Sequence, residues 1–408
     1  MNKKSFIPIS EYFYDLPADR IAKYPLPRRD QSKLLVYKNS TIHETNFIHI
    51  PDILPPESFL FINNTKVVHA RIKFRRKTGS VIEIFCLSPF KPVDYQLAFS
   101  STGTCSWKCT VGNLKKWKDE PLEYVIIHNQ KKYILRAEKV SIENNEVLVR
   151  FSWDLNMSFG EIIEIAGIVP IPPYLNRESE PVDNERYQTI YSKIQGSVAA
   201  PTAGFHFTPE IMNRLKEKSI YPNEITLHVS AGTFQPVKSG NALDHIMHEE
   251  FFSLKIDTLK ELATGERPII ATGTTTLRTL ESIYWLSLKS IRENKLITHL
   301  GQWDHNELKA AIPFNKAVSE LATFMEKNNK KTLTAETGIM IIPGYTYRAV
   351  DILITNFHQP QSTLLLLVAA FIGNDWKQVY NYALDHDFRF LSYGDSSVLW
   401  KKAPKKLS

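Results

Sequence analysis

The sequence is poor in the features that mark secreted and membrane proteins. Only three of its 408 residues are cysteine, Cys86, Cys105 and Cys109, and three thiols cannot all pair in disulfides. The longest apolar run, residues 364–372, is about half of the ~20 residues that a membrane helix needs. Residues 1–6 hold no apolar signal core. We therefore expect a soluble, cytoplasmic protein with reduced thiols and no membrane partner.

The motifs of several common enzyme classes are also absent. No Gly-x-Gly-x-x-Gly follows a predicted strand and no Walker loop occurs, which argues against a Rossmann dehydrogenase or methyltransferase. Residues 244–250 contain two histidines and three carboxylates, but they do not form the His-Glu-x-x-His motif of zinc proteases. Cys105 and Cys109 lack nearby histidines or a second cysteine pair. We therefore expect no metal cofactor.

Length and composition indicate two ordinary globular domains. A domain usually takes about 100–200 residues, so two domains fit a chain of 408 residues. Hydrophobic residues make up 43% of the chain and charged residues 23%, which is enough apolar material for packed cores. The net charge of +7 is a mild positive bias that is compatible with a nucleic-acid partner.

A change in pattern places one domain inside the other. Between Val67 and about Ile168 the strands are short, turns are frequent and helical periodicity is absent, as in small β-sandwiches and barrels. We predict an inserted all-β domain at residues 69–168, inside an α/β domain made of residues 1–68 and 169–408. Strands are expected in the insertion at residues 71–75, 81–87, 95–100, 123–127, 132–137 and 146–151.

Four basic residues are candidates for RNA binding. Arg71, Lys73 and Arg75 alternate with apolar residues, so a strand would present all three cations on one face. Such a face suits RNA phosphates, and the alternative is an ordinary solvated strand face. Arg28 lies in a separate, extended basic loop.

From Val169 onward strands alternate with helices, which is typical of an α/β domain with a largely parallel sheet. In such sheets ligands bind at the carboxyl ends of the strands. Four loops with small or polar residues occur at residues 201–206, 228–234, 272–276 and 355–358. Each either follows a predicted strand or has the same small-residue composition as the loops that do. We expect these loops to form one site. Residues 288–335 are polar and lysine-rich, and we expect a surface insertion there.

The stretch from residue 196 to residue 208 is the most unusual of these loops. It carries no charge, it consists mainly of small residues, and it holds one histidine, His206. Gly204 allows a close backbone approach and Pro201 stiffens the chain, which predicts a tight loop that presents His206 to a ligand. The alternative is a packing seam with a hydrogen-bonded core histidine.

Two further segments carry chemistry. Residues 272–276 offer backbone N–H groups and hydroxyls at the start of a predicted helix, which suits a carboxylate or a phosphate. The alternative is an ordinary threonine-rich helix cap, and Arg278, just inside that helix, fits either reading. His245 and His248 are three residues apart and would share a face if the segment were helical. Beside Glu249 they favour acid–base chemistry over metal binding.

Nine segments spread over nearly the whole chain form one pattern, at residues 16–35, 61–71, 169–192, 196–207, 228–237, 244–249, 271–282, 355–363 and 388–395. Among them are Pro172-Pro173-Tyr174 and the run Phe-Arg-Phe-Leu-Ser-Tyr-Gly-Asp that ends at Asp395. This pattern resembles the S-adenosylmethionine:tRNA ribosyltransferase-isomerase family of queuosine biosynthesis. The resemblance implies a distorted α/β barrel with an inserted β-barrel domain.

The resemblance also implies a reaction. The ribosyl group of S-adenosylmethionine, a co-substrate, is transferred to 7-aminomethyl-7-deazaguanine in tRNA and isomerised. The product is epoxyqueuosine, and adenine and methionine leave. A base must remove the ribose C5′ proton, which the adjacent sulfonium acidifies, and an acid must help adenine to depart. An anion site should hold the methionine carboxylate. The implied enzyme is a transferase with tRNA as its partner, and a monomer is the default expectation.

Carried onto this sequence, the resemblance implies a set of site residues. The acid–base candidates are His206, His228, His248 and His358, with Glu249 as the group that tunes them. The candidates for substrate binding are Thr202, Gly204, Gly232, Thr233, Thr274, Thr275, Arg278, Asn356 and Asp395. The threonines would bind a carboxylate or phosphate, and Asn356 and Asp395 would hydrogen-bond adenine or ribose.

Three positions depart from the family pattern. Ser230 stands where the family usually has glycine, and Gln359 and Gln361 replace a leucine and a glutamate. The alternatives are therefore a divergent S-adenosylmethionine-using paralog with another substrate and a catalytically silent RNA-binding relative. The presence of all four candidate histidines argues against the silent relative.

Overall fold

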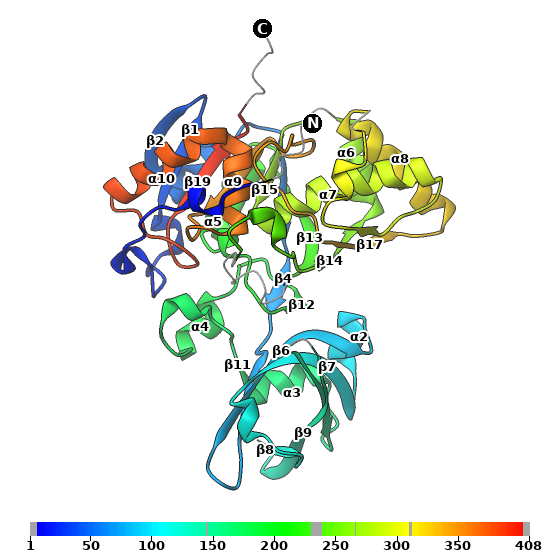
Figure 1. The fold of residues 1–408 in the computed structure, drawn as a ribbon. Coiled ribbons are helices and arrows are strands. Elements are labelled where there is room, and N and C mark those ends of the chain that lie inside the picture. Colours follow the sequence, from blue (N-terminus) through cyan, green and yellow to red (C-terminus); the bar gives the residue numbers. More distant parts are fainter. Residues whose placement is uncertain (1–5, 144–145, 230–238, 266, 310–311, 403–408) are drawn as a thin grey trace.

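The computed structural model describes residues 6–143, 146–229, 239–265, 267–309 and 312–402. The chain is a mixed α/β protein with a large sheet and a smaller, curled antiparallel sheet, joined by a short ribbon (Figure 1). None of the helices within these ranges has the length and apolar character to cross a membrane. Cys86, Cys105 and Cys109 are buried and form no disulfide, as predicted.

Four parallel strands form the centre of the ten-stranded sheet. They are β13 (Pro222–His228), β3 (Phe59–Asn63), β15 (Ile269–Thr272) and β18 (Ile352–Asn356), in that order. Every residue of β3, β15 and β18 is buried, as expected for strands that are covered on both faces. Because the strands are parallel, their carboxyl ends lie along one edge of the sheet.

The flanks of this sheet mix both strand directions. On one side lie β14 (Glu250–Lys255), β17 (Thr332–Thr337) and β16 (His299–Leu300), and on the other β19 (Ser396–Trp400), β1 (Lys33–Lys38) and β2 (Thr41–Asn46). β14 and β19 run antiparallel to β13 and β18, respectively, and β1 runs parallel to β19. The prediction of a largely parallel sheet is therefore correct for its centre only.

The helices follow the sequence patterns closely. They are α1 (Ile50–Ile53), α4 (Pro181–Arg186), α5 (Pro209–Glu217), α6 (Ile256–Thr264), α7 (Thr274–Glu293), α8 (Phe314–Lys327), α9 (Thr363–Ile372) and α10 (Trp376–Asp385). Thr208 caps α5, because its hydroxyl accepts a hydrogen bond from the Ile211 N–H at 3.3 Å. α9, which consists largely of leucine, valine and alanine, is almost entirely buried.

Residues 288–335 do not form the expected surface layer. They include α8, which packs against α6 and α7, and β17, which pairs with β14 inside the large sheet. The apolar residues of α8 that are buried in the main core are Ala317, Val318, Leu321 and Met325. Their spacing places them on one helical face, while Lys316 and Lys327 lie outside it. The lysine content of this segment therefore gave no indication that it contains a helix of the main core.

The smaller sheet is antiparallel and curls around a helix (Figure 1). Its strand order is β11 (Gly167–Ile168), β5 (Arg71–Arg75), β6 (Val81–Lys91), β7 (Thr104–Gly112), β10 (Glu146–Trp153), β9 (Lys131–Glu143) and β8 (Leu122–His128). Phe159, Ile162 and Ile163 of α3 (Phe159–Ala166) fill its core, which is separate from the main core. The sheet is a half-barrel.

One predicted strand of this unit is wrong, because residues 95–100 form the helix α2 (Tyr95–Ser100). The Asp94 side chain caps it by accepting a hydrogen bond from the Leu97 N–H at 2.9 Å. Tyr95, Ala98 and Phe99 are buried, a spacing of three and four that belongs to a helix. The aromatic residues suggested a strand, but the cap and the spacing decide the outcome.

Two short parallel strands connect the units. The chain leaves the main sheet through β4 (Thr65–Val67) and returns through β12 (Ile194–Ser197), and the two strands pair with each other. At the start of this ribbon the Asn63 Oδ1 accepts hydrogen bonds from the N–H groups of Thr65 at 3.0 Å and Leu227 at 3.3 Å. The side chain therefore ties β4 to the end of β13.

A buried carboxylate holds α7 to the chain that leads into β18. Glu281 has no solvent exposure, and it accepts hydrogen bonds from the Tyr345 hydroxyl at 2.7 Å and from the backbone N–H groups of Arg348, Ala349 and Val350 at 2.9–3.1 Å. Burial raises the pKa of this carboxyl group, although these donors favour its ionised form. Four hydrogen-bond donors therefore have the Glu281 carboxylate as their acceptor.

We expect Glu281→Ala to lower the free energy of unfolding by at least about 3 kcal/mol, because each buried donor left without an acceptor costs about 1–3 kcal/mol. Urea denaturation measures the change. The exposed Glu261→Ala on α6 is the control and should stay within about 0.5 kcal/mol of the parent protein. A loss below about 1 kcal/mol for Glu281→Ala would show that water replaces the carboxylate.

Candidate active site

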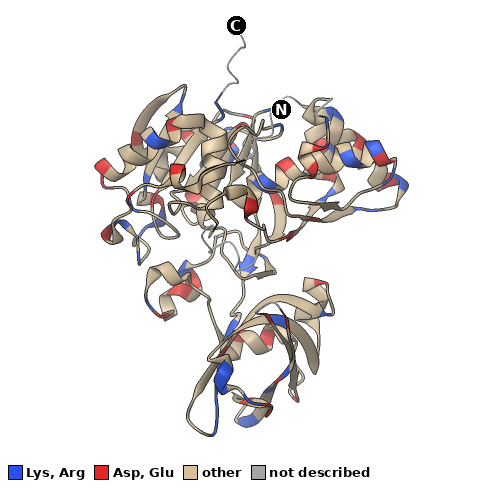
Figure 2. Ribbon diagram, viewed as in Figure 1, with Lys and Arg blue, Asp and Glu red and all other residues tan. Residues whose placement is uncertain are grey.

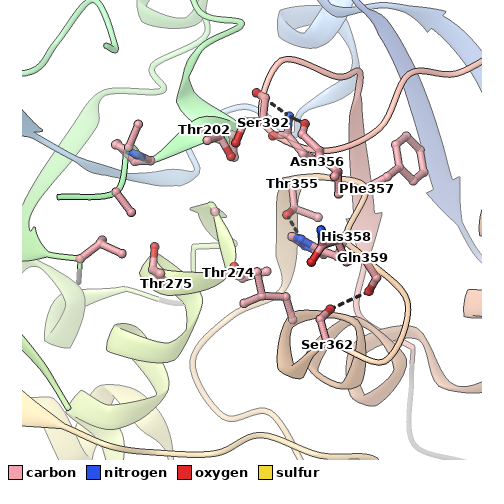
Figure 3. A pocket seen from close by; sticks show the side chains of 18 of the residues that line it. Thr202, Thr274, Thr275, Thr355, Asn356, Phe357, His358, Gln359, Ser362 and Ser392 are labelled. Atoms are coloured by element: carbon pink, nitrogen blue, oxygen red, sulfur yellow. Dashed lines mark hydrogen bonds between the residues drawn. The ribbon is translucent and has the colours of Figure 1, made fainter. Parts of the chain in front are cut away.

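A pocket lies at the carboxyl ends of β13, β15 and β18 (Figure 3). Its volume is about 90 Å³. By the same measure one water needs about 10–15 Å³, so the pocket has room for a group of several atoms. Residues from all four predicted loops line it, among them Thr202, Val229, Thr274 and His358. The expected convergence of the four loops is therefore confirmed.

The start of α7 forms one wall of this pocket. Gly273 precedes the helix with φ +95°, a conformation that favours glycine, and its N–H donates to the Ile354 carbonyl at 2.8 Å. Thr274 and Thr275 follow and line the pocket. The first N–H groups of a helix have no partner within it, and its N-terminus is positive. This wall can therefore bind a carboxylate or phosphate.

The end of β18 forms the opposite wall. The Asn356 Nδ2 donates hydrogen bonds to the carbonyls of Leu391 at 3.0 Å and Ser392 at 3.4 Å. Its Oδ1 is buried and has no hydrogen-bond partner in the described part of the chain. An unpaired buried acceptor is unfavourable, so the pocket offers a position where a ligand donor would be stabilised.

His358 lines the pocket two residues after β18. Its Nε2 and the Thr355 hydroxyl are 3.0 Å apart, and its backbone N–H donates to the Tyr380 hydroxyl at 3.1 Å. The Tyr14 hydroxyl donates to its carbonyl. Burial lowers the pKa of His358 from 6.5 to about 3, although the residue keeps some exposure through the pocket. The ring is therefore held in place and neutral at pH 7.

His206 lies behind the pocket and lines a second, smaller hollow beside it. Its Nδ1 and the Ser32 hydroxyl are 2.8 Å apart, and its ring packs on Phe47. Its Nε2 is buried without a partner. Burial lowers the pKa of His206 to about 3 against the opposing effect of the Arg29 backbone and the Asn356 side chain, and the charges of Arg389 and Arg29 add to the lowering. His206 is thus a core histidine with one nitrogen unsatisfied.

His228 lies between the two units and does not line the pocket. Its ring stacks on Tyr95 of the small unit, with centroids 4.2 Å apart and planes 6° apart. Its Nδ1 donates to the Gly196 carbonyl at 2.9 Å, and burial lowers its pKa. The adjacent Val229 does line the pocket. His228 therefore positions the end of β13.

His248 and Glu249 are exposed and do not line the pocket. The segment that holds His245 and His248 is not helical, so the shared helical face predicted for them is wrong. Glu249 instead bonds His299, whose Nε2 lies 2.8 Å from the Glu249 Oε1. The neighbouring Glu250 is buried.

One group of side chains has the composition of a metal site. The ligand atoms of Glu249, His299 and Glu336 lie within 4.8 Å of one another. Burial and the nearby carboxylate of Glu249 together raise the pKa of Glu336 to about 7. The absence of a metal remains a prediction.

Two predicted ligand contacts have other partners in the structure. The Arg278 Nη1 lies 2.8 Å from the Glu250 Oε2, and both side chains are almost fully buried, so this arginine ties α7 to β14. Asp395 accepts hydrogen bonds from the N–H groups of Lys33 at 3.1 Å and Arg389 at 2.8 Å. Neither residue lines the pocket.

The remaining predicted glycine and threonine positions fall into two groups. Gly204 does not line the pocket, and a side chain there would collide with the Tyr191 hydroxyl, so this glycine is required by packing. Gly232 and Thr233 lie outside the described residues, as does Ser230.

The predicted alternation in β5 is confirmed, because Arg71, Lys73 and Arg75 lie on one face of the strand and buried residues lie on the other. Acidic residues accompany two of them. Arg71 lies 3.4 Å from Glu83 and Lys73 lies 2.7 Å from Glu178. Figure 2 shows basic and acidic residues interspersed over this unit.

The other two basic candidates differ from each other. Arg75 is exposed and has no ion pair with any described residue. Arg28 lies 3.2 Å from Asp30. Because three of these four cations have an acidic partner, the proposed RNA-binding surface is less positive than the sequence suggests.

Several pocket residues were missed as site candidates, and three of them carry polar groups beside the candidate histidine or across from it. Tyr174 and Ser392 line the pocket with their hydroxyl oxygens 2.5 Å apart, and Gln359 lies beside His358. Tyr174 and Ser392 belong to segments that resemble the family, but nothing in the sequence pairs them. Gln359 was noted only as a departure from the family pattern, and Gln361, the other one, donates its N–H to the Tyr12 carbonyl.

A pocket of small residues, hydroxyls and a helix N-terminus at the carboxyl ends of parallel strands defines an α/β protein with a small-molecule site. Comparison with known families gives a more specific class. The chain belongs to the queuosine biosynthesis protein family, whose model matches residues 9–399.

The relatives cover the chain from end to end. An S-adenosylmethionine:tRNA ribosyltransferase-isomerase of Trichlorobacter lovleyi is 35% identical over 96% of this chain and 99% of its own. An enzyme of the same name from Rickettsia bellii is 36% identical over 97% of this chain and 99% of its own. A crystal structure of an S-adenosylmethionine tRNA ribosyltransferase from Thermotoga maritima is 26% identical, covers 95% of this chain and 99% of its own, and has a TM-score of 0.45.

The lowered pKa of His358 predicts a pH dependence. The folded pKa of about 3 lies below the unfolded value of 6.5, so the unfolded chain binds the proton first as the pH falls. Stability is therefore lost below about pH 6.5, by up to about 1.4 kcal/mol per pH unit. We expect His358→Gln to lose about 1 kcal/mol less than the parent protein between pH 7.5 and 5.5 in urea denaturation. The exposed His43→Gln is the control, and parallel curves for all three proteins would contradict the prediction.

Proposed function

We propose that this protein transfers the ribosyl group of S-adenosylmethionine to 7-aminomethyl-7-deazaguanine in tRNA and isomerises it, releasing adenine and methionine. The observation that carries the proposal is the pocket in which Thr274, Thr275, Asn356 and His358 converge. Full-length relatives that are named S-adenosylmethionine:tRNA ribosyltransferase-isomerase support it.

We assign the proton abstraction to His358. A neutral imidazole can lie beside the sulfonium cation without charge repulsion, and its lowered pKa keeps the ring neutral. When the base takes the C5′ proton, the sulfonium becomes a neutral ylide and the imidazole becomes a cation. The total charge of the pocket stays the same, so burial does not penalise the step as it would penalise a new charge.

The opposite walls would orient the co-substrate. The N-terminus of α7, with Thr274 and Thr275, is the proposed site for the methionine carboxylate. The unpaired Asn356 Oδ1 is the proposed acceptor for a donor group of adenine or ribose, and Thr202 lies in the same pocket. Gly232 and Thr233 stay in the proposal on the resemblance alone.

The other candidates take supporting positions. His206 is the second acid–base candidate because its Nε2 is unpaired beside the pocket. His228 fixes the end of β13, and Arg278 and Asp395 hold the walls in place. His248 and Glu249 would contribute only if their segment moved toward the pocket.

The domain boundaries, the barrel architecture and the RNA contacts are part of the same proposal. We place the domain boundaries near residues 68 and 168, because the small sheet has its own core. The ten-stranded sheet is proposed to be a distorted, open α/β barrel, in line with its size, and β16 and β2 form its two edges. Arg28, Arg71, Lys73 and Arg75 are proposed RNA contacts. A cytoplasmic monomer without a metal cofactor completes the proposal.

One observation keeps a second candidate open. Gln359, which departs from the family pattern, lines the pocket next to His358. An altered co-substrate contact there would suit a paralog that uses S-adenosylmethionine on another acceptor.

We expect the protein to release adenine and methionine when it is incubated with S-adenosylmethionine and tRNA that bears the aminomethyl base. His358→Ala should lower kcat by about 10²–10⁴-fold, the usual contribution of a general base. His248→Ala should keep most of the rate because its ring is exposed outside the pocket. Chromatography of the released adenine measures both.

The outcomes separate the candidates. Turnover at the parent rate in a folded His358→Ala variant would remove this residue from the mechanism. S-adenosylmethionine binding without turnover on this tRNA would favour the paralog. Binding of tRNA without any binding of S-adenosylmethionine would favour a silent relative.

A further inference from the structure

A second hollow lies next to the pocket and is lined by arginines. Arg29, Arg186 and Arg389 line it together with His206 and Ser392. Ser392 also lines the first pocket, so the two cavities share a wall. The volume of the hollow is about 20 Å³. One water needs about 10–15 Å³ by this measure, so the hollow accepts a compact group but no nucleoside.

The three arginines are poorly compensated by negative charge. Arg29 donates to the Gln188 carbonyl at 3.2 Å, and Arg186 donates to the Leu26 carbonyl at 2.6 Å. Neither guanidinium forms an ion pair with any carboxylate in the described part of the chain. Only Arg389 does, with Asp395 at 3.1 Å. The hollow therefore carries an excess of about two positive charges by this count.

Two nearby carboxylates are already engaged. Asp183, whose Oδ1 accepts from the hydroxyl of Tyr393 in the hollow, is paired with Arg177 at 2.7 Å. Asp30 is paired with Arg28 at 3.2 Å. A third, the exposed Glu185, acts on Arg29 from a distance and offsets only part of the positive charge.

Two further observations indicate that the hollow is built for an anion. The Nε2 of His206, a residue with 4% exposure, is buried without a hydrogen-bond partner in the wall of the hollow. If the Ser32 hydroxyl donates to Nδ1, then Nε2 carries the hydrogen and has no acceptor within hydrogen-bond distance among the described residues, although the Arg29 backbone and the Asn356 side chain interact weakly with the ring. Burial lowers the pKa of Arg29 and the charge of Arg186 lowers it further, with Glu185 opposing them in part, so an anion in the hollow would stabilise both cations.

We propose that this hollow binds a phosphate group of the RNA whose base enters the adjacent pocket, through Arg29, Arg186 and the His206 Nε2–H. The inference rests on the proposed function, since it names a subsite for the RNA substrate of that reaction. Planar guanidinium groups match the oxygens of a phosphate in pairs, which a hollow with several of them exploits. A methionine carboxylate has the same oxyanion chemistry, but the N-terminus of α7 already provides a place for it.

The test compares RNA binding with S-adenosylmethionine binding, both without turnover. Arg29→Gln and Arg186→Gln remove charge but keep a donor for the carbonyls that these side chains bond. We expect each to weaken tRNA binding about tenfold and to lower the slope of log K against log salt by about 0.7–0.9, the value of one lost phosphate contact. Calorimetry should give an unchanged affinity for S-adenosylmethionine.

Two controls keep the result specific. Arg29→Lys keeps the charge and should recover most of the tRNA affinity. Arg267→Gln removes an exposed arginine next to the opposite end of β15 and should leave both affinities unchanged. If the glutamine variants do not fold, phenylglyoxal modification of the parent protein replaces them. In that experiment tRNA, but not S-adenosylmethionine, should protect Arg29 and Arg186.

Three results would overturn the proposal. They are unchanged tRNA affinity in both glutamine variants, loss of S-adenosylmethionine affinity in place of tRNA affinity, and equal effects of Arg267→Gln. Failure of the proposed function is a different result. A parent protein that binds tRNA through these arginines but never releases adenine would keep the subsite and remove the assigned reaction.

Discussion

Parallel hydrogen bonding between β13, β3, β15 and β18 fixes the position of the pocket. Strands that run in the same direction end at the same edge, so segments far apart in the sequence meet there. The pocket walls come from the residues just after these ends, where the backbone has left the ladder and can face a ligand. The flanking antiparallel strands widen the sheet without moving this edge. A change in register of one central strand would displace a whole wall.

The pocket and the hollow beside it concentrate polar groups that folding alone does not satisfy. His206 Nε2, Asn356 Oδ1 and the hydroxyls of Thr272 and Thr276 are all buried without a hydrogen-bond partner among the described residues. Each one costs stability, and most buried polar groups in proteins are paired. Elsewhere the Glu281 carboxylate is well paired, whereas the Arg278 Nη2, the Trp107 Nε1 and the His305 Nδ1 also lack a partner. The unpaired groups at this edge of the sheet indicate ligand binding because Asn356 and His206 belong to the walls of the pocket and the hollow.

The sequence predicted the strand ends and loops of the site because those signals are local. The threonines of residues 272–276 open α7 as their pattern indicates. The errors arose where distant partners decide. Glu249 and Glu250 look alike in the sequence, but only Glu250 is buried, where it meets an arginine from α7.

Distant partners also decided the structure of whole helices. Residues 95–100 became a helix against their aromatic content, and α8 entered the core despite its lysines, because both bury an apolar helical face against neighbours far along the chain. The segment resemblance identified the family, but it did not reveal which of the four histidines reach the pocket.

The ribbon of β4 and β12 has a mechanical consequence. A module attached by a single linker can swivel about every axis, whereas here the outgoing and the returning strand are hydrogen-bonded to each other. Twisting would strain that pairing, so tilting of the half-barrel toward or away from the main sheet is the less costly motion. The stacked rings of Tyr95 and His228 lie across this joint and act as a stop. A bulky polymer that pushed on the half-barrel would therefore press on the carboxyl end of β13.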